Sequence, residues 1–421
     1  MSAERCRVAV VGAGPSGLAV ATELARSGVG RIIVIEREAE AGGIPRHCGH
    51  SPFGMREYRR VLSGPAYTRR LVADACRQGV EIRTCTSVVR LGNGGCLTLS
   101  SAAGEQQLEA DRVVLCTGNR ETPRAARLVS GTRPLGVLTT GALQSMVYLK
   151  RRIPFRHPVI VGSELVSFSA FLTCRHAGIR PRAMIDHHAR AAAWPFATLL
   201  PKLFGAEVLL DSRLQSIDGR ARVEAVTLLD ASGRSRRVDC DGVVFSGDFV
   251  AESTLVRASH LALDPASGGP LIDQFGRCSD SRVFSCGNLI HPVDTAGWCW
   301  AEGRRTATAV RLSLEGGLER YNQVTPITSH DDRIRYFTPQ RIAISEADDA
   351  TVEDWPHREL QLRFHDRVHG QLSLGDDRGM QQCRRVRCRR GDRVVMALPP
   401  IGRISESSEL RLDFSGMGGS R

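Results

Sequence analysis

The sequence predicts an α/β protein with two Rossmann-like dinucleotide-binding domains and a small β-rich C-terminal module. The first observation is a glycine-rich segment at 8–17, Val-Ala-Val-Val-Gly-Ala-Gly-Pro-Ser-Gly. The second is an altered version of that segment at 159–167, Val-Ile-Val-Gly-Ser-Glu-Leu-Val-Ser. The third is a change of texture after about residue 330, where short alternating segments such as 359–364 and 393–398 are typical of β-strands.

The first half has every part of a dinucleotide-binding βαβ unit. We predict a strand at 7–12, a helix at 16–27 and a strand at 31–36. Glycines in the turn let the backbone approach a pyrophosphate, which then faces the positive end of the helix. Glu36 ends the second strand, where a carboxylate can bind ribose hydroxyls. The residues expected to hold the cofactor here are Gly12, Ala13, Gly14, Pro15, Ser16, Gly17, Glu36 and Arg37.

The second half repeats this order with altered chemistry. Gly162 is kept, but Glu164 and Ser167 stand where the other two glycines would be. The Glu164 side chain would fill the space that a pyrophosphate needs, and its charge would oppose phosphate. Asp186 could still bind an NAD ribose, and the two histidines after it could instead meet a ribose phosphate. Two alternatives therefore remain for the second half. It could bind NAD(P), or it could be a domain that has lost nucleotide binding and keeps only its role in packing.

These repeats suggest a domain plan in which one domain is split along the chain. Strands ending in Thr117-Gly118 and Ser246-Gly247 mark corresponding points of the two halves. The predicted segments are an FAD-type domain at 1–122 and 268–325, an NAD(P)-type domain at 123–267, a β-rich domain at 330–414 and a disordered tail at 415–421.

Composition narrows the class of partner. The net charge is +12, but aromatic residues are only 5% and the arginines are scattered, so we expect no nucleic-acid partner. No stretch is long enough for a membrane span, and no signal peptide fits before the first strand, so we expect a cytoplasmic protein. The 13 cysteines contain no Cys-x-x-Cys pair, and we expect no metal site within this chain.

Over about residues 5–315 these motifs resemble the two-dinucleotide-domain flavoproteins of the glutathione-reductase-like fold. That resemblance implies that the first half binds FAD. The family's terminal motif usually reads Gly-Asp, with the acid on the flavin's ribityl chain, whereas this chain has Gly287-Asn288. Asparagine can still accept and donate hydrogen bonds, so FAD should bind through an altered contact. The further cofactor residues that the resemblance implies are Gly43, Arg46, Val88, Thr117, Gly118, Gly287, Asn288, Thr295 and Ala296.

A narrower resemblance rests on the segments 42–54 and 295–304 and on Pro339-Gln-Arg-Ile in the β-rich C-terminal module. They are similar to the FAD-binding subunits of dye-linked, multi-subunit dehydrogenases. That group includes hydrogen cyanide synthase, opine oxidases and proline or D-hydroxyproline dehydrogenases. It implies two partners, a second, amine-oxidising flavoprotein and a small [2Fe-2S] protein. Because this chain lacks the cysteine spacing for a cluster, the cluster would come from a partner.

Candidate catalytic residues follow the double glycine. Cys48 stands alone in its loop, so a dithiol mechanism is not expected. Arg46, His47 and His50 are candidates to bind a carboxylate substrate or to move a proton. The alternative is that Arg46 contacts FAD and the histidines form local hydrogen bonds. His291 is a candidate on the same grounds.

The helix after Thr295 should direct its positive end at the flavin, where it would stabilise negative charge on the reduced ring. Trp298 and Trp300 fit a flavin wall and core packing equally well.

Three functions remain in view. The first is an FAD-dependent oxidoreductase subunit that oxidises an amino acid, imino acid or opine and passes electrons to a partner or acceptor. The second is an NAD(P)H-dependent reductase of a ferredoxin-like or other acceptor, which needs a working second site despite Glu164. The third is a non-catalytic electron-relay or scaffold subunit.

Overall fold

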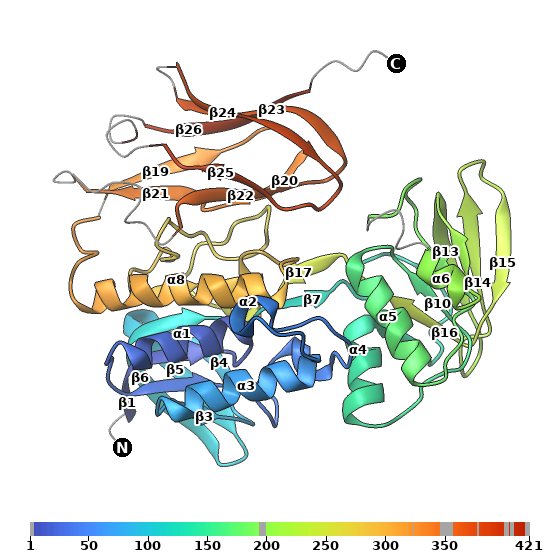
Figure 1. Ribbon diagram of the computed structural model, residues 1–421, viewed down its shortest axis with the longest axis horizontal. Coiled ribbons are helices and arrows are strands. Elements are labelled where there is room, and N and C mark those ends of the chain that lie inside the picture. The colour runs from blue at the N-terminus through green and yellow to red at the C-terminus, as the bar shows by residue number, and fades with distance from the viewer. Residues whose placement is uncertain are drawn as a thin grey trace. The chain divides into compact units, whose positions relative to one another are not determined.

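The computed structural model describes residues 4–192, 199–321, 323–345, 357–376, 379–399, 404 and 408–416 (Figure 1). The chain forms two compact units. The first unit contains residues 1–43, 68–119 and 251–421, and the second contains 44–67 and 120–250. Each unit is built around a sheet whose parallel strands carry one of the two glycine-rich turns.

The first unit holds a seven-stranded sheet in the order β3-β2-β1-β6-β5-β4, with β18 paired to β6. Its parallel strands are short apolar runs, and β2 is buried at all four positions, as expected for strands covered on both faces. The hydrophobic core includes Ala9, Ile33 and Val113 from neighbouring strands. The elements are β1 (Glu4–Val11), α1 (Pro15–Arg26), β2 (Ile32–Ile35), α3 (Gly64–Arg77), β3 (Glu81–Arg83), β4 (Ser87–Leu91), β5 (Cys96–Ser101), β6 (Gly104–Leu115), α7 (Thr254–Arg257), β18 (Val283–Ser285) and α8 (Ala296–Leu314).

Helices α1 and α8 lie side by side in the first unit (Figure 1). Gly303 makes this close approach work, because a Cβ there would stand only 2.4 Å from the Ser16 carbonyl oxygen. The packing places the start of α8 beside the turn that begins α1. Two segments far apart in the sequence therefore meet at one edge of the sheet.

The rest of the first unit is the predicted β-rich module. One of its sheets has the order β21-β19-β26-β23-β24 and the other the order β20-β22-β25. Their apolar side chains alternate with exposed ones, as in β26, where Leu410, Leu412 and Phe414 are buried. The strands are β19 (Gln323–Thr328), β20 (Ile334–Thr338), β21 (Arg341–Ile344), β22 (Glu359–Phe364), β23 (Val368–Asp376), β24 (Gly379–Cys388), β25 (Val394–Ala397) and β26 (Leu410–Gly416).

The second unit holds a five-stranded parallel sheet, β12-β11-β10-β16-β9, and a four-stranded sheet, β15-β14-β13-β8. Alternate residues of the central strand serve two cores. Ile160 packs with Phe171 and Leu143 of the helices on one face, and Val159 packs with Val226 of the smaller sheet on the other. The elements are η1 (Ile44–His47), α2 (Met55–Tyr58), β8 (Ser130–Gly131), β9 (Val137–Thr139), α4 (Thr140–Gln144), η3 (Ser145–Leu149), β10 (Pro158–Val161), α5 (Leu165–His176), β11 (Ala183–Ile185), α6 (Leu199–Leu203), β12 (Glu207–Leu209), β13 (Ser212–Asp218), β14 (Ala225–Asp230), β15 (Ser235–Asp239) and β16 (Gly242–Phe245).

The predicted fold class is confirmed: two Rossmann-like sheets and a β-rich C-terminal region. The paired strands β7 (Asn119–Glu121) and β17 (Phe249–Ala251) carry the chain between the units. Domain limits remain a prediction, and the compact units group several segments differently. Residues 44–67 and 120–122 join the second unit, whereas residues 251–267 and the β-rich module join the first. Of the predicted tail, Ser415 and Gly416 lie in β26 and residues 417–421 lie outside the described part.

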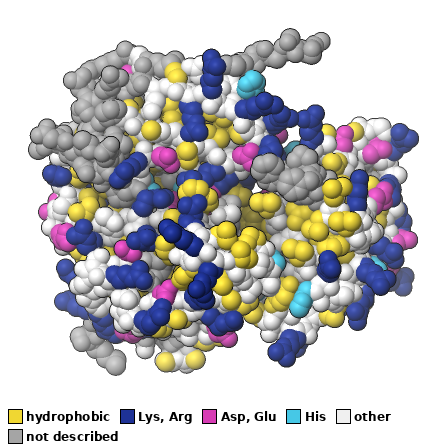
Figure 2. Space-filling view, viewed as in Figure 1, with side chains coloured by type: hydrophobic (Ala, Val, Ile, Leu, Met, Phe, Trp, Pro, Cys, Tyr) yellow, Lys and Arg dark blue, Asp and Glu magenta, His cyan; other side chains and the backbone are white. Residues whose placement is uncertain are grey.

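Among the described residues, no helix is long and apolar enough to cross a membrane. Lys and Arg side chains are scattered among hydrophobic and acidic ones on the face that Figure 2 shows. The excess positive charge is therefore spread over this face.

Candidate functional site: two nucleotide turns

The first glycine-rich turn is packed as a phosphate-binding turn requires. Gly12 has a φ of 103°, and a Cβ there would lie 2.5 Å from the Cys116 carbonyl oxygen. A Cβ on Gly17 would lie 2.0 Å from the Gly12 carbonyl oxygen, so the third glycine brings α1 against the strand. Gly14 differs, because a Cβ there would meet nothing within 4 Å. The turn is closed behind and open in front of Gly14, where a pyrophosphate can approach the N-terminus of α1.

Glu36 holds this turn from the end of β2. Its carboxylate accepts hydrogen bonds from the Ala13 amide at 3.0 Å and from the Glu38 amide at 3.0 Å. The side chain is buried, so the acid fixes the turn as well as standing at the ribose position predicted from the sequence. Arg37 is exposed, and its guanidinium lies 3.9 Å from the Glu38 carboxylate.

The other predicted cofactor residues of the first unit lie at or near the same sheet edge. Gly43 approaches the turn closely, since a Cβ there would be 2.8 Å from the Gly14 Cα. The Thr117 hydroxyl donates to the Glu252 carbonyl at 2.7 Å, and Gly118 adopts a φ of 78° with open space around it. Val88 lies half-buried in β4.

The start of α8 completes the first site. Asn288 links both ends of the loop before the helix, because its amide nitrogen donates to the Asp294 carbonyl and its amide oxygen accepts from the Asp294 amide, each at 3.0 Å. Thr295 is the exposed N-cap and Ala296 is the first helical residue. The positive end of α8 therefore opens to the surface of this unit, as the flavin-facing role predicted for it requires.

A buried charge cluster lies directly behind this loop. The Gly287 amide donates to the Glu302 carboxylate at 2.6 Å, and His291 Nε2 lies 3.1 Å from the same carboxylate. The His357 ring is buried, with its Nδ1 3.9 Å from Glu302. Burial opposes the charge of Glu302, but the neighbouring histidines outweigh it and hold the pKa of the Glu302 carboxyl well below its usual range. Burial lowers the pKa of His357 to about 4.

His291 is thus a buried partner of Glu302 in the structure. Its proposed part in catalysis remains a prediction.

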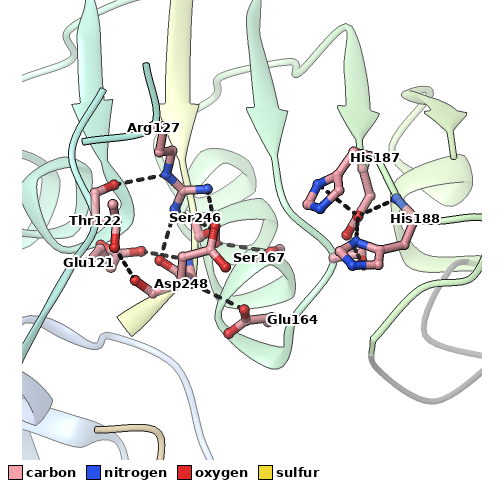
Figure 3. Close-up of polar contacts among 12 residues, drawn as sticks. Glu121, Thr122, Arg127, Glu164, Ser167, His187, His188, Ser246 and Asp248 are labelled. Atoms are coloured by element: carbon pink, nitrogen blue, oxygen red, sulfur yellow. Dashed lines mark hydrogen bonds and ion pairs between the residues drawn. The ribbon is translucent and has the colours of Figure 1, made fainter. Parts of the chain in front are cut away.

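The second glycine-rich turn lies among polar side chains, and Figure 3 shows Glu164 beside Asp248. Gly162 has a φ of 126°, and a Cβ there would lie 2.6 Å from the Ser246 carbonyl oxygen, as at Gly12 in the first turn. The Glu164 side chain folds over Gly247, where its Cδ would lie 2.5 Å from an added Cβ. Its carboxylate accepts a hydrogen bond from the Asp248 amide at 3.1 Å. A carboxylate therefore occupies the front of this turn.

Polar contacts also close the strand end beside Glu164. Arg127 donates to the Asp248 carboxylate at 2.7 Å and to the Gly247 carbonyl at 2.9 Å. Glu121 accepts hydrogen bonds from the Gly141 amide at 2.8 Å and the Gly247 amide at 3.2 Å. Burial raises the pKa of this carboxyl above its usual value.

Asp186 occupies the ribose position of the second half, and its carboxylate is hydrogen-bonded to neighbouring residues of the same unit. Its carboxylate accepts from the Ser163 hydroxyl, from the His188 amide at 3.0 Å and from His188 Nδ1 at 2.8 Å. With His187, these side chains place ligand atoms within 4.8 Å of one another, close enough for a metal ion. The carboxylate already accepts three hydrogen bonds within the fold, however, so the geometry favours a structural role.

The loop with the predicted catalytic residues belongs to the second unit. Arg46 and His47 lie in η1. His50 Nδ1 lies 3.3 Å from the Ser51 carbonyl, and burial lowers the pKa of His50. The Cys48 thiol donates to the Gln144 side-chain oxygen at 3.4 Å, and burial raises its pKa to about 12. A neutral, hydrogen-bonded thiol is unreactive, which agrees with the absence of a dithiol motif.

These residues fit FAD in the first unit, because the turn is packed behind Gly14, open in front of it and held by an acid at the ribose position. The residues of the second unit do not fit a pyridine nucleotide, because the Glu164 side chain fills the space that corresponds to the one in front of Gly14. When bound, FAD supplies the acceptor for two electrons from a substrate.

Comparison with known proteins identifies the family to which this fold belongs. The family model described as pyridine nucleotide-disulphide oxidoreductase matches residues 6–311. The chain belongs to this family. It is therefore an FAD-dependent oxidoreductase, of a family whose members bind FAD and NAD(P).

Curated relatives include the A-type subunits of two opine oxidases. The chain is 28% identical to the one from Rhizobium meliloti (strain 1021) over 44% of its length and 39% of the relative. It is 24% identical to the one from Agrobacterium tumefaciens (strain Ach5) over 73% of its length and 65% of the relative. The chain thus spans less than two thirds of these proteins. It is also 26% identical to the glutamate synthase [NADPH] small chain of Mycobacterium tuberculosis (strain CDC 1551 / Oshkosh), over 73% of this chain and 67% of that protein.

Solved structures agree on the fold. The thioredoxin reductase of T. acidophilum aligns with a TM-score of 0.62 at 18% identity, covering 74% of this chain and 99% of that one. The L-proline dehydrogenase of P. horikoshii aligns with a TM-score of 0.54 at 16% identity, covering 75% of this chain and 57% of that one.

Sequence reasoning missed the charged residues around the start of α8. Glu302 had a visible signal, since it shares a helix face with the buried Cys299 and Thr306, where an acid needs a partner. The ion pairs of Asp294 with Arg363 of β22 and with Arg393 had no such signal, because they join distant parts of the chain.

Proposed function

We propose that this chain is the FAD-binding subunit of a multi-component dehydrogenase. It would oxidise an amino acid, imino acid or opine and pass the electrons to a partner or acceptor, without using NAD(P). The observation that carries the proposal is the Glu164 carboxylate lying over Gly247 and hydrogen-bonded to the Asp248 amide. A nucleotide pyrophosphate would have to displace this side chain and lie beside its charge.

The surrounding contacts make displacement costly. The part-buried Asp248 amide would lose the hydrogen bond that Glu164 accepts, and such a bond contributes about 0.5–1.5 kcal/mol. Asp186 would also have to give up hydrogen bonds to bind a ribose. An intact flavin half joined to a closed nucleotide half supports an enzyme that receives electrons from a substrate other than NAD(P)H.

The curated relatives support a multi-subunit role, because their names describe subunits or chains of larger enzymes. A second flavoprotein and a small [2Fe-2S] protein would be the partners. Within this subunit, Arg46, His47, His50 and His291 are the candidates for substrate binding and proton transfer.

One observation favours a second function, an NAD(P)H-dependent reductase. The chain is as similar to a glutamate synthase [NADPH] small chain as to the opine oxidase subunits. This function requires Glu164 to move aside when a nucleotide binds.

The proposal is tested by anaerobic reduction of the purified, FAD-loaded chain. We would add proline, 4-hydroxyproline, sarcosine and an opine such as octopine in turn, and follow the flavin absorbance. Bleaching by one of these compounds is the expected result. If only NADH or NADPH bleaches the flavin, the proposal fails and the reductase function replaces it. If no compound bleaches it, co-purification with partner subunits decides whether this chain is only an electron relay.

A further inference from the structure

An arginine of the β-rich module lies against the first turn of α8. Arg393 precedes β25, and its guanidinium carbon stands 3.9 Å from the centre of the Trp298 ring. Its Nε donates to the Gln361 side-chain oxygen at 2.6 Å. These two contacts hold the guanidinium plane, because stacking on the indole and the Nε hydrogen bond both restrict its rotation.

The outer fork of this guanidinium is available to a ligand. In the part of the chain that the structure describes, no residue accepts a hydrogen bond from the two terminal nitrogens of Arg393. The side chain is only 19% exposed. Burial lowers the pKa of Arg393, although the carboxylates of Asp294, Glu359 and Glu302 oppose this shift.

Its nearest acid is already used by other residues. The Asp294 carboxylate pairs with Arg363 through one oxygen, and the other oxygen accepts from the Gln361 amide at 3.0 Å. Arg393 Nε lies 3.9 Å from that second oxygen, at the limit of an ion pair. Two arginines therefore share one carboxylate in a mostly buried place.

We propose that Arg393 binds the carboxylate group of a small organic acid at the start of α8. A guanidinium with both terminal nitrogens available binds a carboxylate through two parallel hydrogen bonds. This inference rests on the proposed function, since amino acids, imino acids and opines all carry a carboxylate. It places substrate recognition in the β-rich module, outside the family-matched residues 6–311.

The role of the module follows from this position. Arg363 and Gln361 of β22 fix Asp294, which stands directly before the N-cap of α8, and Arg393 then faces the same helix turn. The module would thus supply the substrate's anchor, while the dinucleotide fold supplies the flavin. Variation in this module would change substrate choice without altering the flavin site.

The test uses two probes that differ in charge and cannot be confused with a substrate turnover. Tetrahydrofuran-2-carboxylate is a ring analogue of proline, and tetrahydrofuran-2-carboxamide is its neutral counterpart. Each is titrated into the FAD-loaded protein while the flavin absorption difference is recorded. The wild type should bind the carboxylate at least about 10-fold more tightly than the amide.

Arg393→Met should lower carboxylate affinity about 10- to 100-fold, to the level of the amide, and leave the amide unchanged. Arg393→Lys should keep part of the preference, because it retains the charge and loses the fork. Arg387→Met, on the exposed side of β24, is the matched control and should bind both probes as the wild type does. If Arg393→Met does not retain FAD, the comparison of Arg393→Lys with the wild type decides.

Equal binding of the two probes by the wild type, or an unchanged carboxylate affinity in Arg393→Met, would overturn the site. The two proposals fail separately. If a substrate bleaches the flavin with the same KM in Arg393→Met and the wild type, the carboxylate site is wrong and the dehydrogenase stands. If the carboxylate probe binds through Arg393 but no amino acid, imino acid or opine reduces the flavin, either in the purified chain or together with co-purified partner subunits, the site stands and the dehydrogenase is wrong.

Discussion

The two glycine-rich turns of this chain can be compared residue by residue. In the first, the space in front of Gly14 is open, and in the second the Glu164 side chain fills the corresponding space. In both turns the first glycine, Gly12 or Gly162, packs closely against the carbonyl of the residue that follows the neighbouring strand of the sheet. The first glycine of a nucleotide-binding turn is thus required by the packing of the fold, whereas the second, Gly14 here, is required only to leave space for the ligand. The second half of this protein has kept the former and changed the latter.

A second pair of residues repeats the contrast. Glu302 and Glu121 are both buried, and each accepts an amide hydrogen bond from a glycine just after a strand, Gly287 and Gly247. Histidines surround Glu302 and lower the pKa of its carboxyl, whereas burial raises the pKa of Glu121. Similar hydrogen bonds therefore accompany a lowered carboxyl pKa in the flavin half and a raised carboxyl pKa in the other.

Transferring the glutamate into the first turn should have the largest effect. Gly14 has a φ of −79°, so other residues can adopt its backbone conformation, and an added Cβ meets no protein atom. Gly14→Glu should therefore fold normally but lose FAD affinity by at least about 100-fold, because the side chain takes the pyrophosphate space. Visible flavin absorbance after purification measures the loss. Gly14→Ala is the graded control and should retain more flavin. Full flavin content in Gly14→Glu would mean that this turn does not bind the pyrophosphate.

Acid should destabilise the flavin half through His357. The pKa of His357 is about 4 in the folded protein, below the ordinary value of 6.5. Between these two pH values the unfolded chain binds a proton at this histidine and the folded chain does not. Stability should fall as the pH drops from 6.5 towards 4, with a contribution of about 2–3 kcal/mol by pH 4.5. His357→Leu should reduce the pH dependence in denaturant unfolding by this amount. Identical slopes for the variant and the wild type would show that His357 is not held neutral.

Opening the second turn should have a smaller effect. Glu164→Gly should increase NADH or NADPH affinity by about 10-fold, because it removes both the bulk and the charge. Glycine is tolerated at a helix N-cap at little cost, and Glu164 is the N-cap of α5. Glu164→Gln keeps the bulk and removes the charge, so the two variants separate steric from electrostatic exclusion. Calorimetric titration measures the affinities, and unchanged nucleotide binding in both variants would place the obstacle elsewhere.

The smallest effect should come from the residue between Gly162 and Glu164. Ser163 is buried, donates to Asp186 and accepts from the Ala192 amide at 3.0 Å. At the corresponding point of the first turn, Ala13 uses only its backbone amide to bind Glu36. Ser163→Ala should lower the free energy of unfolding by about 1 kcal/mol, since Asp186 keeps its hydrogen bonds to His188. A loss of several kcal/mol would show that the serine holds the whole second turn.

The sequence was sufficient for the parts of the fold that are local. Glycines, an acid at the end of the second strand and apolar runs lie within a few dozen residues, so the first turn and the obstructing Glu164 could be predicted. The sequence did not indicate that Glu164 would accept a hydrogen bond from the Asp248 amide, because that contact joins residues more than a whole βαβ unit apart. The Arg393–Trp298 contact was equally hidden, since an exposed and a buried arginine look alike in a sequence.

The measurement that tests the central claim most directly is the rate of flavin reduction by NADH and by NADPH in the wild-type, FAD-loaded chain. Anaerobic stopped-flow mixing at saturating nucleotide records it. We predict no reduction beyond a slow background, because Glu164 occupies the front of the second turn. Rapid, nucleotide-dependent bleaching would contradict the account, since it would mean that the second half of the protein is a working pyridine nucleotide site.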